Sequence, residues 1–168
     1  MNLGNQQLQI KFEKAIKMLC DHIPISGERE KPQLMHSLRV GMYLFNNDYA
    51  DDVVIGGLLH DVIEWTDCPE KTIQEEFGQK VLKIIKANTK NREIKDVVER
   101  RKEYVDRCAE VGDEALIVKA ADAIDSYKYY QAIQRQKEID RSIAIAKLII
   151  KKGLKDKIVG ELKEVTKR

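Results

Sequence analysis

The chain is poor in cysteine and has no long apolar run, and each shortage argues against a class of protein. Its three cysteines, Cys20, Cys68 and Cys108, lie far apart, and no pair has CxxC spacing. This pattern argues against a disulfide framework or a cysteine-rich zinc site and favours reduced thiols in a cytosolic protein. No apolar run approaches the ~20 residues of a membrane span, and the N-terminal residues lack a signal-peptide pattern. We therefore expect a cytoplasmic protein that does not act in a membrane.

An excess of charge of one sign is also missing. The 168 residues include 30 basic and 28 acidic side chains, which are interspersed and give a net charge of +2. This balance does not mark a nucleic-acid-binding protein, so we expect no nucleic-acid partner. Residues 147–157 are locally basic, and we interpret them as a solvated helix face rather than as a nucleic-acid or membrane site.

Helix-forming residues dominate what is present. Hydrophobic residues make up 43% and charged residues 35% of the chain, which is typical of a soluble globular protein. Apolar residues recur at helical spacing almost throughout, and no segment alternates as a strand would. We predict helices over residues 8–19, 34–45, 53–63, 73–77, 81–85, 94–108, 115–133, 138–152 and 154–167. For the helix predicted over residues 94–108, the predicted apolar face is Val97, Val98, Tyr104 and Val105. Gly56 and Gly57, inside the apolar helix 53–63, predict a close approach between helices. The sequence therefore predicts an all-α protein.

A metal site is indicated by residues 58–65, LLHDVIEW. On a continuous helix, His60 and Glu64 would share a face, and Asp61 could converge with them at a helix end. His36 lies on the preceding predicted helix, and Asp122 lies in an alanine-rich helix where a carboxylate needs a neutralising partner. An imidazole and carboxylates that converge can bind a divalent ion. Taken singly, His36 also fits an ordinary partly buried histidine, and Asp122 also fits a salt bridge to Lys119.

The pattern H…HD…D resembles the HD superfamily of metal-dependent phosphohydrolases. In that family the matching residues are metal ligands, so the resemblance implies that His36, His60, Asp61 and Asp122 bind one divalent ion. It also implies an all-helical, single-domain HD-type bundle over residues 1–168, with a core over about 5–130 and C-terminal helices over about 138–167. Two roles for these C-terminal helices stay open, a cover over the site and the interface of a homodimer.

Within the superfamily, the chain is most similar to the hydrolase domain of RelA/SpoT-type stringent-response proteins and to their small single-domain relatives. The segments that carry this likeness are SGE at 26–28, GLLHDVIEWTD, Phe77-Gly78 before Val81, Arg101-Lys102, and ALIVKAADAIDS. Those proteins remove pyrophosphate from the 3′ position of (p)ppGpp, usually with Mn²⁺. The resemblance therefore implies a nucleotide substrate and Mn²⁺ as the expected ion.

Two positions depart from that pattern. The family's Glu-Asp pair is Glu64-Trp65 here, and its asparagine four residues after the distal aspartate is Ser126. Glu64 remains a candidate catalytic residue that orients or deprotonates the attacking water. An indole has no basic atom, so Trp65 cannot share that role. It would either stack a base or pack as a core or interface residue.

Several further side chains are candidates for substrate binding. For the cationic ones, the alternative is a structural salt bridge. They are Arg39, Trp65, Arg101, Lys102, Lys119 and Ser126. Three other functions also stay open. MHSLRVGMYL resembles the start of HD-type 5′-deoxynucleotidases, which act on nucleoside monophosphates. Trp65 and Ser126 also fit a nucleotide-binding HD module that has lost hydrolysis, and the plainest alternative is a helical interaction protein without a metal.

Overall fold

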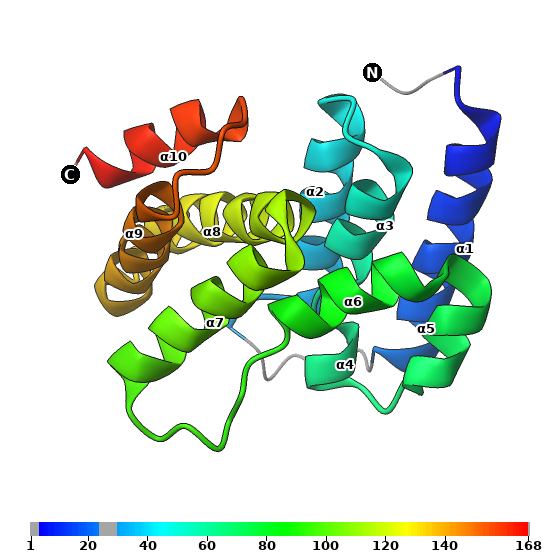
Figure 1. The fold of residues 1–168 in the computed structure, drawn as a ribbon, viewed down its shortest axis with the longest axis horizontal. Helices are drawn as coiled ribbons and strands as arrows, with labels where there is room; N and C mark the ends of the chain where they lie inside the picture. Colours follow the sequence, from blue (N-terminus) through cyan, green and yellow to red (C-terminus); the bar gives the residue numbers. More distant parts are fainter. Residues whose placement is uncertain (1–3, 24–29, 168) are drawn as a thin grey trace.

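The protein is helical, with no strand in the part that the structure describes. The structure is a computed structural model that describes residues 4–23 and 30–167 (Figure 1). The predicted all-α class is confirmed. The SGE segment at 26–28 lies outside the described residues. The helices within them are α1 (Gln6–His22), α2 (Gln33–Asn46), α3 (Asp51–Leu59), α4 (Val62–Trp65), α5 (Glu70–Phe77), α6 (Gln79–Asn88), α7 (Val97–Val111), α8 (Asp113–Ala132), α9 (Gln136–Lys151) and α10 (Ile158–Thr166).

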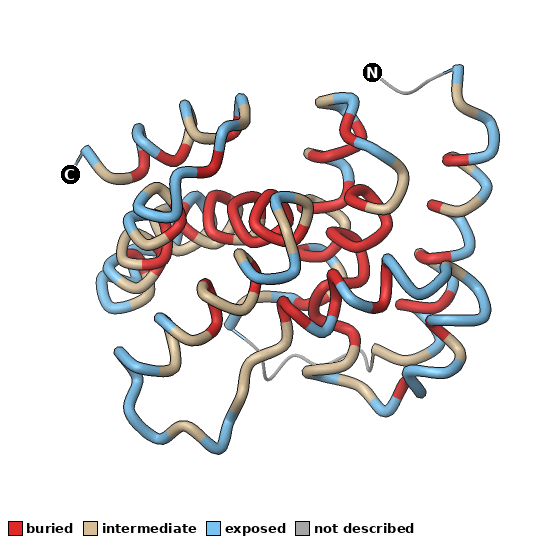
Figure 2. The backbone as a smooth tube through the Cα atoms, viewed as in Figure 1, coloured by how far each residue is buried: buried red, intermediate tan, exposed pale blue. Residues whose placement is uncertain are grey.

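Helix α8 is the central element of the fold. It runs across the middle of the molecule, and α2, α3, α6, α7, α9 and α10 all pack against it (Figure 1). Its residues from Ala115 to Ala121 are all buried, as the continuous red stretch of the tube in Figure 2 shows. Alanines in this stretch let neighbouring helices approach closely. The next turn of α8 carries Asp122, which is thereby held where α2 and the end of α3 meet.

Glycines bring α3 close to its neighbours, as predicted. A Cβ atom on Gly57 would lie 2.2 Å from Leu44 Cδ1 of α2, and one on Gly56 would lie 2.7 Å from Ile84 Cγ2 of α6. Real carbon atoms do not approach so closely, so a Cβ atom at either position would force the Leu44 or Ile84 side chain to shift. The close packing of α2 on α3 fixes the distance between the two histidines that these helices carry.

Three helix predictions were wrong in their extent. The predicted helix 154–167 begins only at Ile158. The predicted helix 53–63 ends at Leu59, and α4 begins only at Val62. The predicted helix 94–108 begins at Val97, because the Asp96 side chain caps it by accepting a hydrogen bond from the Glu99 amide at 2.7 Å.

The apolar face predicted for that helix is only half confirmed. Tyr104 and Val105 are buried, but Val97 and Val98 are 46% and 71% exposed. They lie in the first turn of α7, where Val97 lines the wall of a cavity rather than the core.

The C-terminal helices pack onto the rest of the protein. Helix α9 contacts α7 and α8, and α10 contacts α8 and α9. The Tyr43 hydroxyl of α2 also donates a 2.7 Å hydrogen bond to Glu161 of α10. The division between the two helices falls at Gly153, as predicted, where φ is +79°. Among the described helices, none has the length and apolar character needed to cross a membrane.

Candidate metal centre

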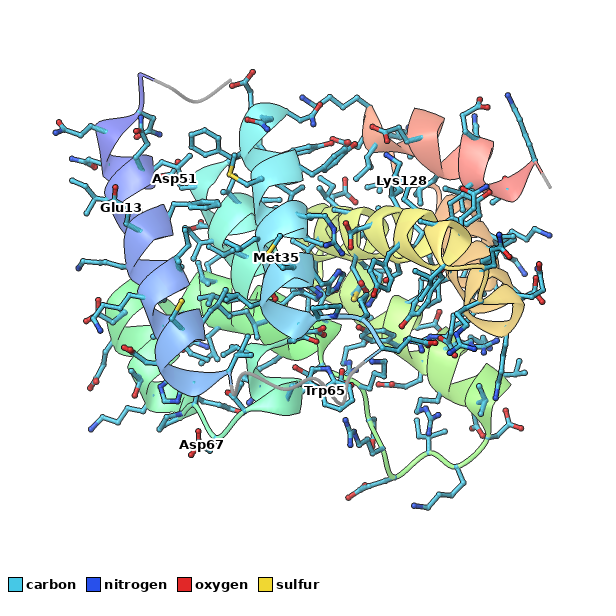
Figure 3. All side chains as sticks on the ribbon, turned by 180° about the vertical axis from the view of Figure 1, so that it is seen from behind. Glu13, Met35, Asp51, Trp65, Asp67 and Lys128 are labelled. Carbon is cyan, nitrogen blue, oxygen red and sulfur yellow. The ribbon has the colours of Figure 1, made fainter. Side chains whose placement is uncertain are left out.

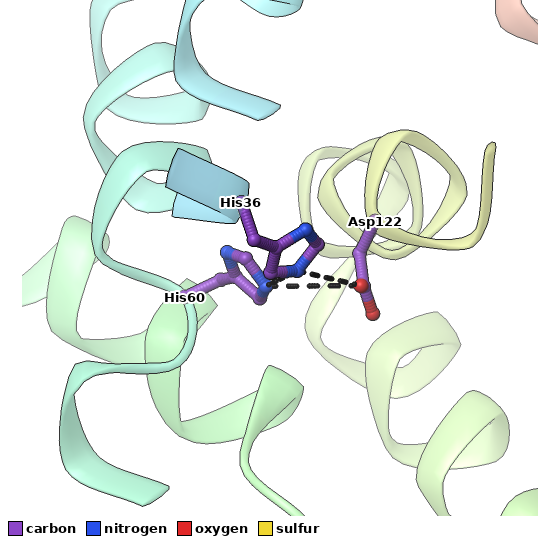
Figure 4. A group of neighbouring side chains, drawn as sticks. All are labelled: His36, His60 and Asp122. Carbon is purple, nitrogen blue, oxygen red and sulfur yellow. Dashed lines mark hydrogen bonds and ion pairs between the residues drawn. The ribbon is translucent and has the colours of Figure 1, made fainter. Parts of the chain in front are cut away.

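Four side chains from three segments converge on one point. His36 comes from α2, His60 from the end of α3, and Asp122 from α8 (Figure 4). Asp61, which follows His60, comes from the junction of α3 and α4. His36 Nε2 lies 3.2 Å from His60 Nε2 and 3.1 Å from Asp122 Oδ1. Asp61 Oδ2 lies 3.5 Å from His60 Nε2 and 3.9 Å from His36 Nε2. The structure thus brings together the four residues that the sequence singled out.

A break in the helix makes the adjacent pair converge. Leu59 is the last residue of α3, and Asp61, with φ −101° and ψ −3°, precedes α4. Neighbours on a continuous helix point about 100° apart. At this turn, His60 and Asp61 can instead direct their side-chain atoms to the same place. The expectation of a continuous helix that carries His60, Asp61 and Glu64 is therefore corrected.

Hydrogen bonds fix the orientation of both imidazoles. His60 Nδ1 donates to the Gly57 carbonyl oxygen at 2.7 Å, and His36 Nδ1 donates to Asp125 Oδ2 at 2.6 Å. Arg39 donates two hydrogen bonds to the same carboxylate, from Nε to Oδ1 at 2.6 Å and from a terminal nitrogen to Oδ2 at 2.9 Å. When the Nδ1 atoms carry the protons, the two Nε2 atoms present lone pairs. A carboxylate that hydrogen-bonds a metal-binding histidine in this way is common around metal ions.

This donor set fits a divalent cation. Two imidazole lone pairs and a carboxylate oxygen, from His36, His60 and Asp122, lie within 4.8 Å of one another in a buried place. Without a proton or a cation between them they repel each other. Nitrogen and oxygen ligands together suit ions such as Mn²⁺ and Zn²⁺.

The charge states of the site also suit a cation. Burial lowers the pKa of His60, which favours the neutral ligand form. Burial opposes ionisation of Asp122, but Lys119 together with His36, Lys31 and His60 holds the pKa of that carboxyl well below its usual range. His36 differs from these two groups: burial and Lys31 act to lower its pKa, yet its hydrogen bonds to Asp122 and Asp125 raise it above the ordinary value, so a bound cation would have to displace a proton from this imidazole.

Asp122 forms the salt bridge to Lys119 that the sequence offered as one alternative, and it also faces the two histidines of the donor set. Lys119 is 1% exposed, and its ammonium donates to Asp122 Oδ2 at 2.7 Å and to the Tyr104 hydroxyl. Ser126 donates to the other oxygen, Oδ1, at 3.1 Å. Lys119 therefore neutralises one side of the carboxylate, while Oδ1 faces the two histidines.

Glu64 is turned away from the role that a shared helix face would have given it. Its Oε1 lies 2.8 Å from Lys90 Nζ and 3.4 Å from an Arg92 terminal nitrogen, and its Oε2 accepts from the Lys90 amide at 3.3 Å. The side chain is only 2% exposed. In this arrangement the carboxylate holds the segment that follows α6.

Two adjoining cavities lie beside the metal centre and share Trp65, Lys90, Glu138 and Arg141. We call the first the metal-side cavity, of about 380 Å³. Its further lining residues are Glu30, Lys31, Gln33, Asp61 and Tyr130. We call the second the Trp65 cavity, of about 450 Å³. Its further lining residues are Glu64, Arg92, Val97, Arg100, Arg101, Tyr104, Lys137 and Ile145. Because Asp61 lines the metal-side cavity, a ligand there can reach the metal centre.

Trp65 forms part of both linings. It is the last residue of α4 and is labelled in Figure 3. The residue is 39% exposed, and the Arg92 guanidinium lies 4.5 Å from the centroid of its ring. Since the ring is part of two cavity walls, it is no core residue.

The other predicted substrate-binding residues have different places. Arg101 lines the Trp65 cavity, and Ser126 contacts Asp122. Arg39 is bound to Asp125, and Lys119 is buried beside Asp122. Lys102 is exposed and lines a different hollow, with Glu99, Glu103, Asp106, Arg107 and Glu110, so the structure does not bring it to the site.

Sequence reasoning missed several residues of the site. Gln33 donates to Asp61 Oδ2 at 2.7 Å, and Lys31 donates to Ser126 at 2.9 Å. Asp125 could have been predicted most easily, because it follows Asp122 by three residues and so lies on the same face of the helix. The remaining ones are Lys90, Arg92 and Arg141.

Comparison with known proteins identifies the family. The model of the HD domain family matches residues 16–145, most of the chain, and the chain belongs to that family.

Three curated relatives and solved structures are similar to it. A guanosine-3′,5′-bis(diphosphate) 3′-pyrophosphohydrolase of Aquifex aeolicus is 28% identical over 150 residues, which cover 77% of this chain and 22% of that protein. The enzyme of the same name called MESH1, from Drosophila melanogaster, is 27% identical over 105 residues, 61% of this chain and 58% of that protein. The chain therefore spans about a fifth of the first relative and somewhat over half of the second. A solved metazoan ortholog of SpoT, described as hydrolysing ppGpp, has a TM-score of 0.75 at 20% identity and covers 92% of this chain and 93% of its own.

Proposed function

We propose that the chain is a metal-dependent phosphohydrolase that cleaves a phosphate or pyrophosphate ester of a nucleotide. The observation that carries this proposal is the four-residue donor set beside a cavity with cationic walls. The names of the curated relatives support a narrower substrate, a guanosine tetraphosphate-like nucleotide cleaved at its 3′-pyrophosphate. Among divalent ions we propose Mn²⁺, on the resemblance to the RelA/SpoT-type hydrolases.

The residues of the site have separable tasks in this reaction. An ion held by His36, His60, Asp61 and Asp122 would lower the pKa of a water molecule, in some sites to ~7. Asp125 and the Gly57 carbonyl keep the two imidazoles oriented toward the ion.

The cationic walls would bind the phosphate groups. Lys31, Lys90 and Arg141 line the metal-side cavity, and cations that face developing negative charge stabilise a transition state. Glu64 is our candidate for accepting the proton of the attacking water. Lys90 and Arg92 now hold its carboxylate, so a phosphate group that attracts Lys90 would release it for this task.

One experiment tests the proposal directly. ppGpp and a panel of nucleoside mono- and triphosphates are incubated with the purified chain and Mn²⁺, Co²⁺ or Mg²⁺, and released phosphate and pyrophosphate are measured. We expect metal-dependent release of pyrophosphate from ppGpp that disappears in Asp61→Asn. The matched control is Asp67→Asn, since the Asp67 side chain is 94% exposed.

Two other outcomes would redirect the proposal. Cleavage of nucleoside monophosphates alone would favour the 5′-nucleotidase alternative. Nucleotide binding without product from any substrate would favour the module that has lost hydrolysis, a reading that the ion pairs of Glu64 with Lys90 and Arg92 also support. We also propose a cytoplasmic location. We further propose a homodimer, and gel filtration with light scattering would test this oligomeric state.

A further inference from the structure

The Trp65 cavity is larger than the hydrolytic step needs. The metal-side cavity, through Asp61, already adjoins the four ligands that would act on the scissile phosphate. Beyond Trp65 lies a second space of about 450 Å³, within the range of small-molecule sites. The rest of a nucleotide substrate has to occupy some space next to the metal-side cavity.

The walls of this second cavity combine a ring, apolar side chains and cations. Trp65, Tyr104, Val97 and Ile145 supply aromatic and aliphatic surface. Six cationic side chains and two acidic ones complete the lining. They are Lys90, Arg92, Arg100, Arg101, Lys137 and Arg141, with Glu64 and Glu138. A site for inorganic phosphate alone would not need the apolar part, whereas an aromatic base attached to phosphates uses both.

One donor in this lining also needs an acceptor. Arg101 Nε is buried and has no hydrogen-bond partner among the described residues. A buried donor without an acceptor costs about 1–3 kcal/mol. An acceptor on a bound ligand would satisfy it, and both a base and a phosphate carry acceptors.

We propose that the Trp65 cavity binds the nucleobase of the substrate, with the base stacked against Trp65 and its polar edge or a neighbouring phosphate reaching Arg101. This proposal deepens the proposed function and rests on it, because the base belongs to a substrate only if the chain hydrolyses a nucleotide. Trp65 is then a specificity-determining residue. It stands where the RelA/SpoT-type hydrolases keep a second acid, and it trades an acidic group for a stacking surface. Ligands with a base are therefore favoured over phosphates without one.

The test uses binding, so it does not depend on turnover. Trp65 is the single tryptophan of the chain, so its fluorescence reports on ligands in the two cavities that it lines. The Mn²⁺-loaded protein is titrated with GDP, ADP, ribose 5-phosphate and inorganic pyrophosphate. We expect the two nucleotides to quench the emission and to bind at least about 10-fold more tightly than the two ligands that lack a base. Equal affinity for GDP and pyrophosphate, or no binding of either nucleotide, would overturn the proposal.

Variants separate stacking from folding and from charge, with calorimetry as the readout. Trp65→Leu should weaken GDP binding by about 10-fold and leave pyrophosphate binding unchanged, while Trp65→Phe should restore most of the loss. Arg101→Gln should weaken GDP, whereas Lys83→Ala, which removes an exposed charge of α6, should not. Unchanged GDP affinity in Trp65→Leu refutes the assignment.

The two proposals fail in different ways. If the chain binds GDP through Trp65 but hydrolyses no phosphate ester, the proposed function fails and the base site stands. If hydrolysis is metal-dependent but Trp65→Leu binds and cleaves every nucleotide as the wild type does, the base site fails and the proposed function stands.

Discussion

Replacing Asp125 by asparagine should weaken the metal centre without touching a ligand. Asp125 Oδ2 accepts the 2.6 Å hydrogen bond from His36 Nδ1, and its carboxylate receives two further bonds from Arg39. Asparagine has nearly the same shape, but it lacks the negative charge that makes His36 a stronger base. Loss of such a partner typically lowers metal affinity about 10- to 100-fold, which corresponds to roughly 1.4–2.7 kcal/mol.

Competition with a chromophoric chelator would measure this change as a Kd for Mn²⁺. Circular dichroism should show an unchanged fold, and Asp67→Asn provides the control for removal of a carboxylate. Arg39→Ala should have a smaller effect than Asp125→Asn, because Arg39 is 38% exposed and reaches His36 only through Asp125. An Mn²⁺ affinity of Asp125→Asn within twofold of the wild type would refute the idea that this carboxylate supports His36.

Four further predictions concern the ligands, the acid, the packing and the thiols. Asp61→Ala should abolish stoichiometric metal binding in elemental analysis, and retained metal would contradict the ligand assignment. Glu64→Ala should keep the metal but lose hydrolysis, so unchanged turnover would remove Glu64 from the mechanism. Gly57→Ala should lower the free energy of unfolding in urea by about 1–3 kcal/mol, because its methyl group would clash with α2; equal stability would contradict the close approach. Iodoacetamide at pH 7 should label exposed Cys20 but not Cys108 in the native protein, since burial raises the pKa of the Cys108 thiol to about 11; equally fast labelling of both would count against this packing.

The proposed metal ligands were predictable because each is marked by its neighbours. His60 and Asp61 follow an apolar run, and Asp122 lies among alanines that had to be buried. A charged group in such surroundings needs a partner, so the sequence itself pointed to a site. The break between α3 and α4 was not predictable in the same way. Val62 and Ile63 continue the apolar spacing past His60, and only the packing of α2, α3 and α8 favours a turn there.

The residues of the cavity walls were harder to predict from the sequence, because they come from irregular or distant segments. Lys90 and Arg92 lie between α6 and α7. The sequence has no regular spacing there from which the direction of a side chain could be predicted. Arg141 and Glu138 come from α9, whose position over the site depends on its packing against α7 and α8. Of the two predicted roles of the C-terminal helices, these residues support the cover over the site.

Metal binding and substrate choice are thus assigned to different parts of the chain. The four ligands sit on α2, the α3–α4 junction and α8, where burial and the glycine contacts leave little freedom for change. The cavity walls come mainly from the segment after α6, from α7 and from α9, which a sequence can alter without disturbing the ligands. Trp65 lies at the boundary, five residues after His60 and in the walls of both cavities. Under the two proposals, a substitution at this position would change which nucleotide reaches the metal while the metal itself stays bound.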